Sequence, residues 1–242
     1  MLLHAEDLGE AHEVAVLVHG HLGSAESWWR VVPLLVARGY RVLALDLPGH
    51  GRSPRDPGLT VERAADAVAE TVEHLAPQGA ALAIGHSYGG LVLAAAAARI
   101  DPGRAVYVDA AFALAGGLDH AEVTASYERD RRERTVDRLR ATRPQYSERD
   151  CVVEGVAAER FDAATAASVA AGPGGAWDPA PGSIVVRADP SAFVGDDDVR
   201  RLARRGVDVR SIRGAAHSVW YSHFDEFVAV LPEVFERTRG VS

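Results

Sequence analysis

The sequence predicts an α/β protein in which a mostly parallel, doubly wound sheet is covered by helices on both faces. Short apolar runs such as "VAVLV" (14–18) and "SIVVRAD" (183–189) alternate along the chain with segments of helical pattern. Strands that are apolar along most of their length are typical of a parallel sheet buried on both faces. A short turn flanked by glycines, "GHSYG" (85–89), links one such run to an Ala-rich helical segment and is called the join below. These observations together predict the fold class.

The first half of the chain is expected to contain four strands and three helices. Between the strand at 14–18 and the strand "RVLALD" lies an amphipathic helical pattern from about Ala25 to Ala37. Thr60 is a good N-cap for the next helix, because its side-chain oxygen can accept a hydrogen bond from a backbone N–H in the first turn. The remaining expected elements are "RVLALD" (41–46), the helix after Thr60, "AALAI" (80–84), the helix after the join, and "RAVYVDA" (104–110).

The second half returns to the same alternation only after an interruption. A charged helical stretch followed by a Gly/Pro-rich connector (170–182) separates "RAVYVDA" from "SIVVRAD". Long connections of this kind are uncommon inside a compact core and are often functional. We therefore expect a core formed by 1–115 and 182–242, with a helical cap inserted at 116–181, after the strand that ends at Asp109. Beyond it we expect a helix from Asp196, as N-cap, to about Arg205, a strand at 207–214 and a last helix from Phe224 to Thr238.

Composition excludes several classes of function. The 242 residues carry a net charge of −8, with 26 basic and 34 acidic side chains and no basic cluster on an aromatic-rich face, which argues against a nucleic-acid partner. The sequence has no lysine, so Schiff-base chemistry is excluded. Cys151 is the only cysteine, which favours a reducing compartment. With neither a signal-like N-terminus nor a membrane-length apolar run, we expect a cytoplasmic protein with no membrane partner.

The join at 85–89 matches the pattern Gly-x-Ser-x-Gly in the context that this motif requires, a strand before it and a helix after it. Ser87 at the apex is the candidate nucleophile, held on a strained turn above the carboxyl edge of the sheet. Gly85 and Gly89 stand where a Cβ would collide as strand and helix pack closely. Tyr88 begins the helix, so its backbone N–H is free to stabilise an oxyanion.

A serine nucleophile needs a base and an acid that orients the base. His217 lies in the small-residue loop "GAAHS" after the strand at 207–214 and is favoured over His223, which already lies at the start of the final helix. For the acid, Asp189 ends the strand "SIVVRAD" at the catalytic edge, and Asp109 ends its strand in the same manner. We expect Asp189 to be the acid, with Asp109 as its rival.

A second oxyanion donor is expected from the loop "VLVHGHLGS", where His21 follows His19 and Gly20. Two histidines spaced in this way could also bind a metal, but no convincing further ligands accompany them, so neither a metal nor a cofactor is expected. Aromatic residues near the expected site are candidate walls of a substrate pocket: Trp28, Phe112 and Trp220.

Four stretches, "HGHLGSAESW", "DLPGHGRS" (46–53), "GHSYGG" and "GAAHS", occur in an order and spacing that resemble α/β-hydrolase-fold proteins. The resemblance implies Ser87 as nucleophile, Asp189 as acid and His217 as base, with the N–H groups of His21 and Tyr88 as oxyanion donors. It also implies that the insertion is the family's helical cap. Only thirteen residues precede Val14, so the N-terminal hairpin of the family should be shortened.

The resemblance also narrows the chemistry. Ser87 excludes the dehalogenases and epoxide hydrolases of this fold, which use an aspartate at this position, and the lack of lysine argues against its hydroxynitrile lyases. We expect a serine hydrolase that cleaves an ester, thioester or lactone of a small, largely apolar substrate. A C–C bond hydrolase, a cofactor-free perhydrolase and a ligand receptor that retains the triad remain open. We expect a small-molecule substrate and a monomer or homodimer.

Overall fold

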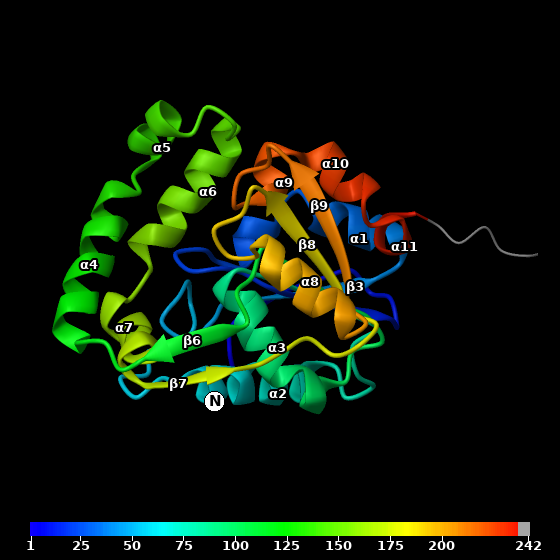
Figure 1. The fold of residues 1–242 in the computed structure, drawn as a ribbon, viewed down its shortest axis with the longest axis horizontal. Coiled ribbons are helices and arrows are strands. Elements are labelled where there is room, and N and C mark those ends of the chain that lie inside the picture. The colour runs from blue at the N-terminus through cyan, green and yellow to red at the C-terminus, as the bar shows by residue number, and fades with distance from the viewer. Residues whose placement is uncertain (237–242) are drawn as a thin grey trace, which may run out of the picture.

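The structure, a computed structural model, describes residues 1–236. Seven strands form one sheet in the order β1-β3-β2-β4-β5-β8-β9, and only the β1–β3 pair is antiparallel (Figure 1). The mostly parallel α/β fold expected from the sequence is confirmed. The strands are β1 (Ala5–Leu8), β2 (Val14–Val18), β3 (Arg41–Leu45), β4 (Leu82–His86), β5 (Ala105–Val108), β8 (Ile184–Asp189) and β9 (Asp208–Arg213).

The N-terminal edge of the sheet is reduced to one antiparallel strand. β1 pairs with β3 from Ala5 opposite Leu45 to Leu8 opposite Val42. Within the described part of the chain, no second strand precedes β2 to complete a hairpin. The expected shortening of the hairpin is therefore present, and it amounts to a single edge strand of four residues.

Two layers of helices cover the sheet, which explains why the central strands are apolar on both faces. Every residue of β2 and β4 is buried. One face packs against α2 (Val61–Leu75), α3 (Tyr88–Ile100) and α8 (Asp196–Arg204). The other face packs against the 3₁₀ turn η1 (Ala25–Trp28) and the helices α1 (Val32–Arg38), α9 (Val219–Ser222), α10 (Phe224–Ala229) and α11 (Pro232–Phe235).

Helix boundaries differ from the expected ones where proline or a different cap intervenes. The helix expected from Ala25 to Ala37 is divided into η1 and α1. The last helix is divided into α10 and α11, because Pro232 has no N–H to donate and disfavours a helical backbone at the residue before it. Its expected end, Thr238, lies outside the described residues. The N-cap of α8 is Gly195 and not Asp196, and the N–H of Gly195 donates to Asp198 at 3.1 Å.

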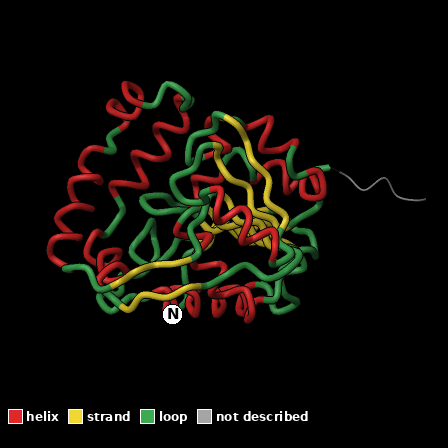
Figure 2. Tube along the Cα trace, viewed as in Figure 1, coloured by secondary structure: helices red, strands yellow, loops and turns green. Residues whose placement is uncertain are grey.

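The segment between β5 and β8 forms four helices attached through a small antiparallel ribbon of β6 and β7 (Figure 2). Figure 1 shows α4, α5 and α6 at one side of the molecule, away from α10 and α11. No helix in residues 1–236 is long and apolar enough to cross a membrane. The elements are β6 (Ala113–Gly116), α4 (His120–Glu133), α5 (Val136–Thr142), α6 (Glu148–Glu159), α7 (Ala163–Ala171) and β7 (Pro173–Ala176).

Candidate active site

Ser87 lies between β4 and α3, on a turn whose backbone conformation few residues other than glycine adopt. Its φ of 51° lies in the left-handed region, which is strained for a residue other than glycine. The flanking glycines permit the close packing: a Cβ on Gly85 would lie 2.7 Å from the carbonyl oxygen of Gly89, and one on Gly89 would lie 2.2 Å from that of His19. The N–H of Ser87 donates to the carbonyl of Val108 at 2.9 Å, which fixes the turn to β5.

Three side chains from separate loops at the carboxyl edge of the sheet form a continuous hydrogen-bonded chain. Nε2 of His217 lies 2.9 Å from Oγ of Ser87. Nδ1 of the same ring lies 2.7 Å from Oδ2 of Asp109, a carboxylate that is 1% exposed. When Nδ1–H donates to that carboxylate, Nε2 is left with a free lone pair that can accept the serine proton.

The expectation that Asp189 orients His217 is wrong: Asp109 occupies that place. Asp189 is 36% exposed at its side chain and faces the guanidinium of Arg187, with 3.4 Å between Nη2 and Oδ1. Asp109 is turned toward the site by a positive φ of 45°, and its N–H donates to Val186 at 2.7 Å. Its position after β5, the direct neighbour of the nucleophile's strand β4, brings it within reach of the imidazole.

The loop after β8 holds Asp109 in this orientation. Oδ1 of Asp109 accepts the N–H of Ala188 at 3.1 Å and the hydroxyl of Ser191 at 2.7 Å. With Oδ2 on His217, both oxygens of this buried carboxylate have partners, as a buried charge requires. The "RADPS" stretch that ends in Ser191 therefore contributes to the site through its backbone and Ser191, while the carboxylate comes from Asp109, the residue after β5.

Two rings enclose His217. Phe193 is stacked on it, with ring centroids 4.1 Å apart and an interplanar angle of 25°. His86 lies on another side at 4.6 Å, and its Nε2–H donates to the carbonyl oxygen of His217 at 3.0 Å. Burial, and next the charge of a protonated His217, hold the pKa of His86 well below its usual value. His86 is therefore neutral at pH 7 and positions the loop of His217 without adding a second positive charge.

The loop after β2 passes directly beside the nucleophile. A Cβ on Gly20 would lie 3.1 Å from Cβ of Ser87 and 2.6 Å from Nδ1 of His86, so glycine permits this approach. His19 is fully buried and fixes the loop: its Nε2 accepts the N–H of Leu47 at 3.0 Å, and its Nδ1–H donates to the carbonyl of Gly20 at 2.8 Å. The predicted oxyanion donors, the N–H groups of His21 and Tyr88, belong to this loop and to the first residue of α3.

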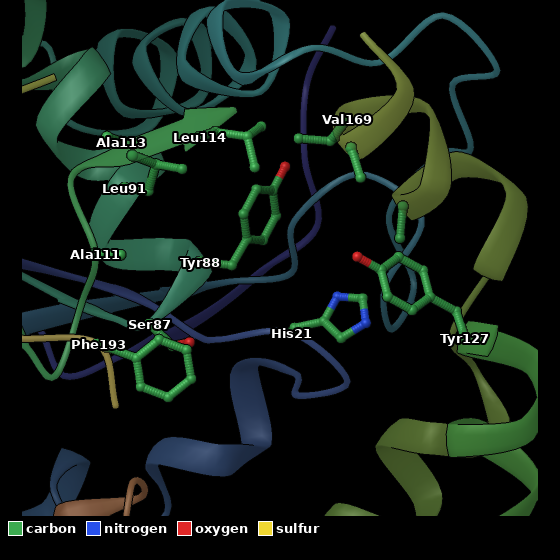
Figure 3. Close-up of a pocket in the computed structure, with 12 residues that line it drawn as sticks. His21, Ser87, Tyr88, Leu91, Ala111, Ala113, Leu114, Tyr127, Val169 and Phe193 are labelled. Atoms are coloured by element: carbon green, nitrogen blue, oxygen red, sulfur yellow. The ribbon is translucent and has the colours of Figure 1, made fainter. Parts of the chain in front are cut away.

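Two cavities open at Ser87 and differ in character. The apolar cavity has a volume of about 250 Å³ and includes no Asp, Glu, Lys or Arg in its lining (Figure 3). Its walls are His21, Ser87, Tyr88, Leu91, Ala111, Ala113, Leu114, Tyr127, Ala166, Val169, Ala170 and Phe193. The polar cavity has a volume of about 400 Å³ and includes His217 as well as Ser87. Its walls include Ser27, His86, Tyr127, Arg134, Arg143, Gln145, Tyr146, Glu154, Phe193, Ser218 and Trp220.

The floor of the polar cavity contains a buried ion pair. Glu154 on α6 is 4% exposed and pairs with Arg134, which follows α4. Oε1 of Glu154 also accepts the hydroxyls of Ser27 at 2.9 Å and Tyr221 at 2.8 Å. Burial, and next the negative charge of Glu154, hold the pKa of Tyr221 well above its usual value, so it stays a donor. This network attaches the inserted helices to the core beneath the site.

Of the three aromatic residues expected to line a substrate pocket, one lines a cavity at Ser87 and two do not. Trp220 lines the polar cavity. Trp28 is fully buried and stacked on Trp220, with centroids 4.5 Å apart, and Phe112 packs in the core against Tyr107 at 5.4 Å. Neither Trp28 nor Phe112 lines the two cavities at Ser87, so that prediction is wrong for both.

Several wall residues were not anticipated from the sequence, and two aromatic ones, Tyr127 and Phe193, line both cavities. Tyr127 lies in a charged helix whose residues all look solvent-facing, and Phe193 lies in an irregular loop after β8. A single aromatic residue within an otherwise polar stretch was the available signal in each case. Across residues 1–236, no group of three or more His, Cys, Asp or Glu side chains is arranged to hold a metal ion.

The profile of the alpha/beta hydrolase family matches residues 15–230 of this sequence. The chain belongs to that family. A solved esterase structure from Thermogutta terrifontis superposes on 96% of this chain and 94% of its own, with a TM-score of 0.69 at 22% identity, which shows the shared fold.

Curated relatives match over shorter stretches. Methylesterase 8 of Arabidopsis thaliana is 43% identical over 84 residues, 34% of this chain and 30% of the relative. Non-heme chloroperoxidase of Streptomyces lividans is 41% identical over 90 residues, 37% of this chain and 32% of the relative. The matched part of this chain therefore spans about a third of the length of these relatives.

Proposed function

We propose that the protein is a serine hydrolase that cleaves an ester, thioester or lactone of a small, largely apolar substrate. The observation that carries this proposal is the continuous chain from Oγ of Ser87 through His217 to the buried carboxylate of Asp109, with distances of 2.9 and 2.7 Å. Nucleophile, base and orienting acid in this order are what acyl transfer through a covalent intermediate requires. The similarity to a methylesterase supports the ester as the bond cleaved.

The proposed reaction has two halves. Nε2 of His217 takes the hydroxyl proton of Ser87 while Oγ attacks the carbonyl carbon, and the resulting oxyanion is bound by the N–H groups of His21 and Tyr88. His217 then returns this proton to the leaving alkoxide or thiolate, and the acyl group stays on Ser87. Water attacks the acyl-enzyme with His217 again as base, which releases the carboxylic acid and restores the serine hydroxyl.

Asp109 acts on the imidazole rather than on the substrate. It accepts the Nδ1–H of His217, which selects the tautomer with a free Nε2, and it stabilises the imidazolium that forms in each half-reaction. Because Asp109 is itself held by Ala188 and Ser191, the imidazole is positioned before substrate binds.

The positions of the cavities support an orientation for the two ends of the proposed substrate. The leaving group must lie beside His217, which protonates it, and His217 lines the polar cavity only. The acyl group then extends from Ser87 into the apolar cavity. Tyr127 from α4 and Val169 from α7 form part of that cavity, which supports a role for the inserted helices as a cap over the site.

The first experiment compares wild type and Ser87→Ala. We expect fluorophosphonate labelling and multiple turnovers of p-nitrophenyl butyrate by the wild type, and we expect Ser87→Ala to abolish labelling and to lower kcat by several orders of magnitude. Comparable turnover by Ser87→Ala would refute the proposal. Labelling without turnover would instead favour a ligand receptor.

The alternative reactions need their own substrates. The chloroperoxidase relative favours one of them, a perhydrolase that forms a peracid from acetate and hydrogen peroxide. A bromination assay with acetate and peroxide, and a β-diketone substrate for C–C hydrolysis, are measured beside the ester with the same two proteins. If either reaction exceeds ester hydrolysis in kcat/KM, the assignment changes to that reaction.

A further inference from the structure

The apolar cavity contains polar atoms that have no partner in the protein. The hydroxyl of Tyr88 and Nε2 of His21 are both buried and make no hydrogen bond in the structure. Both residues line this cavity. A buried polar group without a partner is unfavourable, so such groups in a binding cavity mark positions where a ligand can supply the missing partner.

The Tyr88 hydroxyl lies at the far end of the cavity from the nucleophile. Figure 3 shows the Tyr88 ring extending away from Ser87, with its hydroxyl toward Leu114 and Val169. A water molecule needs two to four polar partners to be held well, and this end of the cavity offers mainly aliphatic side chains. A polar atom carried by the substrate chain is therefore a better partner for this hydroxyl than an isolated water.

The missing partner is a neutral group. None of the side chains that line the apolar cavity is an Asp, Glu, Lys or Arg, so an ionic substituent there would be buried without a counter-ion. Burial, and next the charge of Arg134, lower the pKa of His21 to about 4, so its ring is neutral at pH 7. Burial also raises the pKa of Tyr88, whose hydroxyl therefore remains a donor.

We infer that the preferred acyl group carries a neutral hydrogen-bonding oxygen, a ketone or a hydroxyl, part-way along an otherwise apolar chain, and that the Tyr88 hydroxyl selects for it. This inference rests on the proposed hydrolysis at Ser87 and on the acyl group lying in the apolar cavity. Tyr88 then has two separate roles: its backbone N–H faces the oxyanion, and its side chain determines acyl specificity.

The test uses pairs of p-nitrophenyl esters that differ only by a ketone: pentanoate against 4-oxopentanoate, and hexanoate against 5-oxohexanoate. For each pair, kcat/KM for the keto ester is divided by kcat/KM for the ester without the ketone, in wild type and in Tyr88→Phe. Intrinsic ester reactivity and any uniform loss of activity cancel when this ratio is compared between variants. We expect Tyr88→Phe to lower this ratio about tenfold for at least one pair. Tyr40→Phe is the matched control, since Tyr40 is a half-buried tyrosine that lines neither cavity at Ser87, and its ratio should stay within about twofold of wild type.

A binding measurement separates this inference from the proposed function. Methyl 5-oxohexanoate and methyl hexanoate are titrated by NMR into Ser87→Ala and into Ser87→Ala with Tyr88→Phe. We expect several-fold tighter binding of the ketone to the first protein and loss of that preference in the second. Three results would overturn the inference: equal ratios in wild type and Tyr88→Phe, equal affinity of Ser87→Ala for the two methyl esters, or the same fall of the ratio in Tyr40→Phe. If the keto ester binds more tightly but no turnover depends on Ser87, the inferred specificity of the cavity would stand and the proposed ester hydrolysis would be refuted.

Discussion

The carboxyl edge of the sheet and the helices α4–α7 build opposite kinds of surface around Ser87. At the sheet edge Asp109 is 1% exposed and both of its carboxylate oxygens are hydrogen-bonded. By contrast, no residue of α4 is buried, although Tyr127 and the adjoining Arg134 line the cavities. Under the proposed function, the reacting groups are therefore held by the core, whereas part of the substrate wall lies on a helix that has no buried residue of its own. Four substitutions or conditions test this contrast.

The largest effect is expected at the acid. Asp109→Asn should lower kcat about 10⁴-fold, because the amide no longer selects the tautomer of His217 or stabilises its cation. Asp189→Asn is the matched control, since it also removes a carboxylate from the end of a neighbouring strand, and it should change kcat by less than about twofold. Both are measured on one ester under saturating conditions. A large loss in Asp189→Asn with little loss in Asp109→Asn would reverse the assignment.

The attachment of the inserted helices to the core should depend strongly on Glu154, whose carboxylate pairs with Arg134 and accepts the hydroxyls of Ser27 and Tyr221. Glu154→Gln leaves Arg134 buried without its counter-charge and should lower the free energy of unfolding by about 3 to 5 kcal/mol. Glu133→Gln breaks an exposed pair with Arg138 in the same segment and should cost less than about 1 kcal/mol. Urea unfolding of the three proteins measures both values. Equal effects would mean that the pair beneath the site does not anchor the segment.

Buried histidines at the sheet edge should make stability depend on pH. Burial lowers the pKa of His21, His50 and His86, with that of His21 at about 4, so the unfolded chain binds more protons than the folded one below the usual histidine value. The free energy of unfolding should therefore have its full value above pH 7 and should fall as the pH drops toward 4. His21 alone should account for a loss on the order of 3 kcal/mol.

Urea unfolding at pH 7, 5.5 and 4.5 measures this dependence. The quantity compared among wild type, His50→Phe and His12→Asn is the change of the free energy of unfolding with pH, and not its absolute value. His50→Phe removes a fully buried imidazole and should flatten the slope, whereas His12 is exposed and its replacement should leave the slope unchanged. An identical slope in His50→Phe would contradict the assignment of this acid sensitivity to the buried rings.

A smaller effect is expected at Ser191, whose hydroxyl donates to Asp109 at 2.7 Å. Ser191→Ala should lower kcat about tenfold, since one hydrogen bond to a buried carboxylate is lost. Ser191→Thr retains a hydroxyl and should recover most of the rate. Ser211→Ala serves as control, because Ser211 contacts Arg187 at 2.9 Å and not the triad. A purely structural role for Ser191 would lower the melting temperature without this recovery of kcat by threonine.

Local patterns in the sequence predicted the fold and part of the site. The position of Ser87 follows from the Gly-x-Ser-x-Gly motif between a strand and a helix, in which Gly85 is explained by its contact with Gly89 inside the same unit. The loop of His217 follows from its place after the last strand. The divided last helix could also have been anticipated, because Pro232 falls inside the expected span.

Other features depend on contacts between distant parts of the chain. Asp109 and Asp189 end their strands alike, and only the hydrogen bonds from Ala188 and Ser191 to one and the guanidinium of Arg187 beside the other distinguish them. The burial of Trp28 against Trp220 is likewise set by tertiary packing between segments nearly two hundred positions apart. No spacing rule in a single sequence reports such pairings.

The inserted helices begin and end at the same two-stranded ribbon. Gly116, the last residue of β6, is paired with Pro173, the first residue of β7, so the two ends of the helical segment lie side by side. The segment is therefore a loop with adjacent ends. The entropic cost of closing such a loop grows only slowly with its number of residues, so its length can change at little cost in stability. In terms of descent and engineering, the segment has the form of an exchangeable module. Under the proposed function, replacing it at β6 and β7 should alter which acyl groups are accepted, while the hydrogen bonds among Ser87, His217 and Asp109 stay in place.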